Sequence, residues 1–248
     1  KEGSKSLDID QGSSSEDDQA DISIRLNNID YNVQKIRVLR SNTSFIHAVL
    51  LAVDPETYKD AYPSNSDKEE KVSKIRTEIA RTLTTEKLES LHGGSIFENF
   101  KEDIQKEMSY QPQYKPKNKK TATPTTEVVN EKAFQSFKTN LLDIPGVSGS
   151  GSWMGEIEMT ELLSEMFDVN IYVVNVKSTD KDIVFAESSG QFSSYCDTDL
   201  YKHDRSVVLI NQGGTEYDLL GPKDNGKNDF TFKSNSKFVK QLYQEICG

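Results

Sequence analysis

The chain has few of the residues that build metal centres and disulfide-stabilised folds. It contains two cysteines, Cys196 and Cys247, and three histidines in 248 residues. Two cysteines exclude a disulfide scaffold and a cysteine-rich zinc site, and three histidines are too few for a multi-histidine metal centre. We therefore expect neither a bound metal nor a cofactor.

Long apolar runs and an excess of positive charge are also missing. No stretch reaches the roughly 18 apolar residues that a transmembrane helix needs, so we expect no membrane association. With 40 acidic against 30 basic residues the net charge is -10, and such a chain repels nucleic-acid phosphates. We therefore expect no nucleic-acid partner. Because hydrophobic residues make up 34% of the chain, part of its length is expected to be solvated tail or loop.

Two segments interrupt the pattern of a folded domain. Residues 1–22 carry seven acidic residues, two lysines and three consecutive serines, and this composition predicts a disordered acidic arm. Residues 110–126 combine three prolines with four lysines, which favours a flexible insertion, the alternative being a docking or import signal. Residues 23–248 are then expected to form one domain. Because the first residue is Lys1, we expect a fragment or a processed product.

The segment from Ser44 to Val53 is apolar almost all round, which predicts a short helix buried in a core. Ser41, Asn42 and Thr43 precede it, and their side chains could cap its free amide groups. The Asp54-Pro55 pair is expected to end this helix.

Periodicity predicts further helices first and strands later in the chain. Helices are expected at 68–91, at 97–108 and at 156–167, and short strands at 36–39, 169–176, 184–186, 207–210 and 217–220. The turn at 212–215 makes the last two strands an antiparallel hairpin. This order predicts an α+β or α/β sandwich.

Three segments carry a resemblance to a known family: residues 41–49, residues 153–173 and residues 207–220. Their order and spacing resemble the ovarian-tumour (OTU) family of papain-like cysteine proteases, most of which are deubiquitinases. The middle segment is the most specific, with Trp153, a Gly-Glu-x-Glu helix start and a Val-Asn-Ile strand. The Ser-Phe-Ile-His-Ala pattern is similar to divergent members in large DNA viruses. The resemblance implies an α+β sandwich with a mostly antiparallel central sheet, a buried helix and flanking helices.

At the catalytic positions this chain departs from the family pattern. The family places a cysteine at the start of the buried helix, where the helix N-terminus favours the thiolate, and a histidine general base before an aromatic residue. Here Ser44 stands at the cysteine position, Glu216 at the histidine position and Asp218 at the position that orients the histidine. The resemblance therefore implies that the Cys–His dyad is absent. It also implies groove residues at Ser41, Asn42, Thr43, Trp153 and Tyr217.

These substitutions favour a catalytically inactive OTU-like domain that binds a protein, either ubiquitin or a subunit of its own complex. It is expected inside the cell, in the cytoplasm or, for a viral protein, in the host cytoplasm or virion. One alternative is an active OTU-type deubiquitinase seen as a Cys-to-Ser variant, although that account does not explain Glu216. A further alternative is a structural component of a larger assembly. We expect His47 to be packed rather than catalytic, and Cys196 to be structural or incidental.

Overall fold

The protein is a mixed α+β fold, as the sequence predicted, seen in a computed structural model that describes residues 19–110, 125–142, 156–180, 183–187, 202–211, 216–223 and 229–247. The strands are β1 (Gln19–Leu26), β2 (Ile29–Ile36), β3 (Asn170–Asp180), β4 (Ile183–Glu187), β5 (Arg205–Asn211), β6 (Tyr217–Pro222) and β7 (Phe232–Lys233). The helices are α1 (Ser44–Val53), α2 (Pro55–Asp60), α3 (Asn65–Thr82), α4 (Thr85–Ser90), the 3-10 helix η1 (Leu91–Gly94), α5 (Ser95–Tyr110), α6 (Thr126–Leu142), α7 (Glu156–Phe167) and α8 (Lys237–Cys247). Among these ranges no helix combines the length and the hydropathy needed to cross a bilayer.

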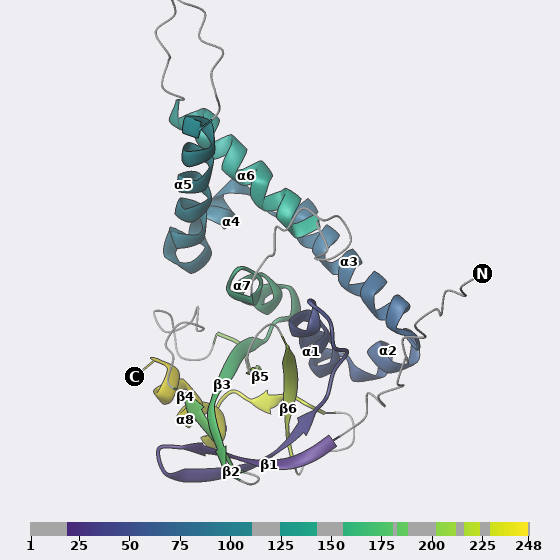
Figure 1. The fold of residues 1–248 in the computed structure, drawn as a ribbon. Coiled ribbons are helices and arrows are strands. Elements are labelled where there is room, and N and C mark those ends of the chain that lie inside the picture. Colours follow the sequence, from purple (N-terminus) through teal and green to yellow (C-terminus); the bar gives the residue numbers. More distant parts are fainter. Residues whose placement is uncertain are drawn as a thin grey trace, which may run out of the picture.

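All the strands belong to one mixed sheet, in the order β3-β4-β1-β2-β6-β5-β7. An additional pairing of β3 with β5 closes the sheet on itself (Figure 1). β1–β4 and β3–β5 are parallel, and β1–β2, β2–β6, β3–β4, β5–β6 and β5–β7 are antiparallel. Most pairings are thus antiparallel, with two parallel exceptions.

Helix α1 lies beneath this sheet and contacts β5 and β6 (Figure 1). Every residue from Ser44 to Ala52 is buried, because the helix is apolar on all sides and is covered by strands on one side and helices on the others. The predicted burial of this helix under one sheet containing the 169–174, 207–210 and 217–220 segments is confirmed.

The two faces of the sheet belong to two different cores. Along β3, Ile171 and Val173 join the core around α1, whereas Tyr172 and Val174 join a second core. This alternation follows from the two-residue period of a strand. The second core also takes in α8, which contributes Phe238, Val239 and Leu242 and was not predicted from the sequence.

Three long helices form a layer that extends away from the sheet, with α6 lying beside both α3 and α5 (Figure 1). Helix α6 was not predicted, although its buried residues recur every four positions: Val129, Ala133, Phe137 and Leu141. Buried Arg76 of α3 stabilises the C-terminal end of α6. It donates from Nε to the Leu141 carbonyl at 2.6 Å and from Nη2 to the Asn140 carbonyl at 2.7 Å. A cation at a helix C-terminus satisfies carbonyls that have no helical partner.

The first hairpin corrects two expectations. The expected acidic arm extended to Ile22, but β1 begins at Gln19 and pairs antiparallel with β2. A strand was expected at 36–39, but β2 ends at Ile36. The physical reason is the turn at Asn27-Asn28, whose φ angles of 45° and 61° suit a two-residue hairpin and allow the apolar residues on either side to alternate.

Other expected boundaries also shift. The helix expected at 68–91 is two helices. Leu83 is the C-cap of the first, and Thr84 caps the second, its hydroxyl accepting from the Lys87 N–H at 3.2 Å. Helix α7 has the expected bounds. Residues 1–18 of the expected arm, and 111–124 of the expected insertion, lie outside the described residues.

Candidate functional site

Ser44 is the first residue of α1, and its hydroxyl oxygen accepts a hydrogen bond of 3.1 Å from the backbone N–H of Tyr217. Tyr217 is the first residue of β6, so the bond joins the start of the buried helix to the start of a central strand. The structure therefore brings together the 41–49 and 216–220 segments, as the resemblance implied. The serine side chain is 0% exposed, so its hydroxyl lies inside the core.

The residues before Ser44 do not cap α1 as predicted. Thr43 occupies the N-cap position without a side-chain cap, since its backbone angles (φ -111°, ψ 11°) are not those of a capping residue. Its hydroxyl instead donates to the Glu69 carboxylate of α3 at 2.9 Å, and it also bonds the Ser41 hydroxyl at 2.8 Å. A hydrogen bond to a charged carboxylate is stronger than one to a neutral backbone amide, which explains why the Thr43 hydroxyl bonds Glu69 and does not cap the helix.

Arg40 organises the acidic side of the site and was not identified from the sequence. Its Nη2 lies 3.0 Å from the Asp218 carboxylate, and its Nη1 lies 3.4 Å from Glu216 Oε2. Asp218 is 1% exposed, whereas the Glu216 side chain is 57% exposed. One guanidinium therefore pairs with a buried and an exposed carboxylate, at the two positions that the resemblance assigns to the histidine and to the residue that orients it. The only signal in the sequence was an arginine next to Ser41.

Among the residues that the structure describes, the candidate bases are all engaged by other partners. A serine hydroxyl needs a general base beside it to become a nucleophile. Glu216 is engaged by Arg40, and the ring of His47 is engaged by Tyr58 and Glu69. The third candidate base, His203, is engaged by Asp168.

His47 lies in a polar cluster between α1, α2 and α3. Its Nδ1 is 2.7 Å from the Tyr58 hydroxyl and its Nε2 is 3.3 Å from Glu69 Oε1, and the histidine is fully buried. Burial raises the pKa of Glu69, but hydrogen bonds and charge from His47 and hydrogen bonds from Ser41 and Thr43 outweigh it, so the net pKa is lowered. Burial, and then the charge of Glu69, raise the pKa of the Tyr58 hydroxyl. The cluster is packed, in line with the expectation for His47.

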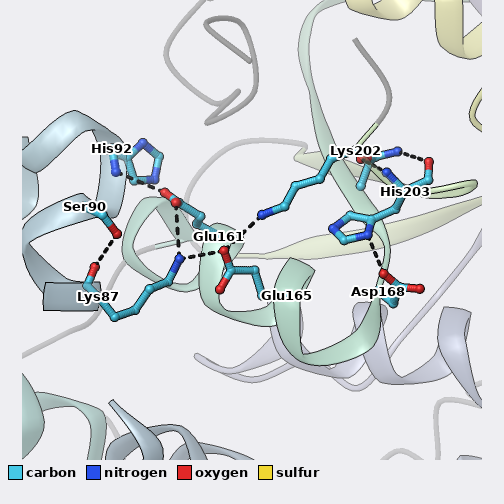
Figure 2. Close-up of polar contacts among 9 residues, drawn as sticks. Lys87, Ser90, His92, Glu161, Glu165, Asp168, Lys202 and His203 are labelled. Carbon is cyan, nitrogen blue, oxygen red and sulfur yellow. Dashed lines mark hydrogen bonds and ion pairs between the residues drawn. The ribbon is translucent and has the colours of Figure 1, made fainter. Parts of the chain in front are cut away.

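A second polar cluster ties α4 and α7 to the segment before β5 (Figure 2). The Glu165 carboxylate of α7 accepts from Lys87 Nζ at 2.6 Å and from Lys202 Nζ at 3.0 Å. Glu161, one turn earlier, accepts from the His92 N–H at 3.0 Å. Burial raises the pKa of Glu165, but the hydrogen bonds and charges of the two lysines have the larger, opposite effect. The net pKa is therefore lowered, and the carboxylate stays ionised. These pairs fix the position of α7.

Figure 2 also shows His203 and Asp168 side by side, with Nδ1 2.5 Å from Oδ1. The His203 side chain is 8% exposed, and no hydrogen bond reaches its Nε2 from the part of the chain that the structure describes. A carboxylate and an imidazole are two of the three groups of a nucleophilic triad. Because none of the described residues places a nucleophile on the ring, we assign the pair no catalytic role.

Two of the five residues of the expected groove are buried. Thr43 and Tyr217 are buried, and the Tyr217 ring packs edge-on against Phe45 with centroids 5.4 Å apart. Ser41 and Asn42 keep exposed surface. Trp153 and Cys196 lie outside the described residues. Over the described ranges, no group of three or more His, Cys, Asp or Glu residues is arranged to hold a metal.

Comparison with protein-family models, with curated proteins and with solved structures found no match for this chain. Its function must therefore be argued from the geometry around Ser44, Glu216 and Asp218.

Proposed function

We propose that this chain is a divergent, catalytically silent OTU-like domain that acts by binding a protein, with ubiquitin as the first partner to test. The observation that carries the proposal is the hydrogen bond between Ser44 and Tyr217. It joins the two segments that would hold the thiol and the imidazole of an OTU protease. The burial of α1 against β5 and β6 supports the same reading.

The loss of catalysis is argued from the groups present. Ser44 offers a buried hydroxyl in place of a thiol, and Glu216 offers a carboxylate in place of an imidazole. Arg40 neutralises that carboxylate and holds Asp218 as well. General-base help is worth about 10²- to 10⁴-fold in rate, so its absence compounds the absence of the thiol.

Binding requires a surface that a partner can reach. Asn42 and Glu216 are exposed beside the buried serine and Ser41 is half-buried, and we call these three residues the rim. The rim lies at the place where an OTU protease would receive the end of its substrate. A protein partner that contacts the rim needs no access to Ser44.

Activity is tested by restoring the catalytic groups one at a time. The unmodified chain, Ser44→Cys and Ser44→Cys/Glu216→His are assayed for cleavage of ubiquitin chains and for labelling by a thiol-directed ubiquitin probe. A version of the double variant with Arg40→Gln is included, because Arg40 would face the new imidazole. Ser66→Cys, an exposed serine in the first turn of α3, controls for the reactivity of any thiol near a helix start.

We expect no cleavage and no labelling by the unmodified chain, and recovery only when both the thiol and the imidazole are present. Robust cleavage by the unmodified chain would show that the catalytic site lies elsewhere. Robust cleavage by Ser44→Cys alone would favour the alternative of an active enzyme whose cysteine has been replaced.

Partner binding is tested separately by titrating ubiquitin against the unmodified chain, followed by calorimetry. Asn42→Arg places a bulky charge on the rim, and Asn99→Arg makes the same change on the exposed face of α5. We expect saturable binding that Asn42→Arg weakens and Asn99→Arg leaves unchanged. If ubiquitin does not bind at all, the ubiquitin-related part of the proposal is wrong.

A further inference from the structure

A cavity of about 290 Å³ lies where the C-terminal end of α1 meets α2, the first half of α3, the end of α7 and the start of β5. Three aromatic side chains line it, and we call it the aromatic pocket: Tyr58, Tyr62 and Phe167. Ser44 stands at the opposite end of α1 from Val53, about 14 Å away along the helix axis at about 1.5 Å per residue. The aromatic pocket is therefore separate from the Ser44 site.

The floor of the aromatic pocket is apolar. Leu50 is buried at 4% exposure, and Val53 lies one turn further along α1. Met166 and Phe167 at the end of α7 are half-buried and, like Val53, pack against the core around α1. Covering apolar surface is favourable, and well-packed interiors leave few gaps larger than a water molecule. An apolar body would therefore be stabilised on this floor.

The aromatic rings come from three places in the fold. Tyr58 belongs to α2, Tyr62 lies in the loop between α2 and α3, and Phe167 ends α7. The hydroxyl of Tyr58 is already engaged by His47 Nδ1 at 2.7 Å, so Tyr58 offers a ligand its ring and not its hydroxyl. Aromatic rings attract one another in offset-stacked and edge-on arrangements, beyond the gain from burial alone. A planar aromatic body is therefore favoured over a linear chain.

Two cations stand on the solvent side of this apolar floor. Arg205, the first residue of β5, is exposed, and Lys71 of α3 is half-buried with Nζ 5.4 Å from the centre of the Tyr62 ring. In the part of the chain that the structure describes, no carboxylate lies within ion-pair distance of either cation. Asp54 is the acidic residue of the lining, and its Oδ1 caps α2 by accepting from the Thr57 N–H at 3.3 Å. The lining therefore has an excess of positive charge above an apolar floor, which is the complement of an amphipathic anion.

We propose that the aromatic pocket binds a small aromatic carboxylate, with its ring on the apolar floor and its carboxylate at Arg205 and Lys71. A guanidinium and an ammonium group provide charge-assisted hydrogen bonds to carboxylate oxygens. The volume of about 290 Å³ stands at the lower end of the about 300–1,000 Å³ of ligand pockets, so one ring with a short acidic side chain fits better than a nucleotide. This site goes beyond the proposed function, and it stands whether or not the chain binds ubiquitin.

Calorimetric titration of the full chain with 3-phenylpropionate, at constant ionic strength set with chloride, tests the site. Two further probes each lack one half of the ligand: propionate has the carboxylate without the ring, and 3-phenylpropanol has the ring without the charge. We expect saturable binding of 3-phenylpropionate that is at least about tenfold tighter than that of either probe, because each probe loses one of the two kinds of contact.

Variants of the two cations test their role. Arg205→Gln and Lys71→Gln should each weaken binding of 3-phenylpropionate about tenfold, since each removes one charge-assisted contact. Arg81→Gln and Lys74→Gln are the matched controls, because both side chains are exposed on α3 outside the pocket. These two controls should leave the affinity unchanged.

A filling variant tests the place of binding. Thr57 is an exposed lining residue on α2, so Thr57→Trp puts a large side chain into the aromatic pocket without removing a core residue. We expect it to abolish binding of 3-phenylpropionate. Thr77→Trp adds the same side chain on the exposed face of α3 and should bind as the unmodified chain does.

A free aromatic acid and an aromatic residue at the C-terminus of a peptide present the same ring and carboxylate. The tripeptide Ala-Ala-Phe separates these sources: tighter binding than that of 3-phenylpropionate assigns the site to a peptide end, and weaker binding assigns it to a free acid. The proposal is overturned if the unmodified chain binds neither, if propionate binds as tightly as 3-phenylpropionate, or if Thr57→Trp binds as the unmodified chain does.

Discussion

The hydroxyl of Ser44 and the backbone N–H of Tyr217 form a hydrogen bond although 173 positions separate the two residues. Both residues are buried, so the bond is shielded from water. It connects the first turn of α1 to the first residue of β6, and it depends on the side chain at the position that the proposed OTU resemblance assigns to the thiol. The serine therefore has a structural role here, whatever its history.

Ser44→Ala should lower the free energy of unfolding by about 1–2 kcal/mol, because the Tyr217 N–H loses its acceptor inside the core. Urea unfolding followed by circular dichroism measures the change. Ser66→Ala, on the exposed start of α3, should stay within about 0.5 kcal/mol of the unmodified chain. Equal effects at the two serines would contradict the assigned role of the bond.

Arg40→Ala should be more damaging than the removal of an exposed arginine. It takes the guanidinium away from Asp218, whose carboxylate is almost fully buried, and we expect a loss of about 1–3 kcal/mol given the partial exposure of Arg40. Arg81→Ala removes an exposed ion pair with Glu78 and should cost less than about 0.5 kcal/mol. Thermal and urea unfolding of both variants provide the comparison. If Arg40→Ala proves as mild as Arg81→Ala, the ion pair is not holding the site together.

Glu69→Gln should reveal a pH-dependent contribution to stability. The pKa of Glu69 is lowered in the folded protein from its ordinary value of 4.5, so its stabilising effect is complete above about pH 4.5 and is lost as the pH falls through the folded value. We expect the variant to be less stable by about 1–2 kcal/mol at pH 7. In urea titrations, the difference in the free energy of unfolding between the variant and the unmodified chain should narrow as the pH falls below 4.5.

Glu70→Gln is the control for this experiment, because Glu70 is the exposed neighbour that pairs with Lys74. Its effect at pH 7 should be below about 0.5 kcal/mol. If the difference in the free energy of unfolding between Glu69→Gln and the unmodified chain stays constant from pH 7 to pH 3, that would argue against the charged network around His47.

The turn of the first hairpin can be tested at Asn28, where φ is 61°. Asn28→Gly should be neutral or stabilising, because glycine adopts positive φ without strain. Asn28→Val should destabilise by about 1–2 kcal/mol, because a branched side chain resists that conformation. Urea unfolding of the two variants measures the difference in stability. If Asn28→Val is as stable as Asn28→Gly, the turn is wrongly placed.

Much of the fold could be predicted from local pattern. The all-apolar run after Ser44 predicted a buried helix, and the spacing of apolar residues predicted α7 with its bounds. The strands at 207–210 and 217–220 were predicted as a hairpin, and they pair antiparallel. These elements are predictable because a segment that is buried on every side, or at alternate residues, has a recognisable pattern of apolar residues.

The missed elements carry weaker or competing signals. Helix α6 was overlooked because it follows the Lys- and Pro-rich segment, although its buried residues are spaced four apart. The first half of β1, residues 19–22, was interpreted as the end of an acidic arm, since the exposed face of the strand is polar and only alternate residues face the core. Half-buried strands resemble solvated segments in composition, and only their pairing with a neighbour reveals them.

The sequence alone determined that no cysteine stands at position 44 and no histidine at position 216, because those are facts of composition at fixed places in the chain. Only the tertiary structure decided what replaced them: Arg40 across Glu216 and Asp218, and the Tyr217 N–H on the Ser44 hydroxyl. The physical reason is the same in each case, because hydrogen bonds and ion pairs act over a few ångströms and the order of strands in the sheet sets which distant residues come that close.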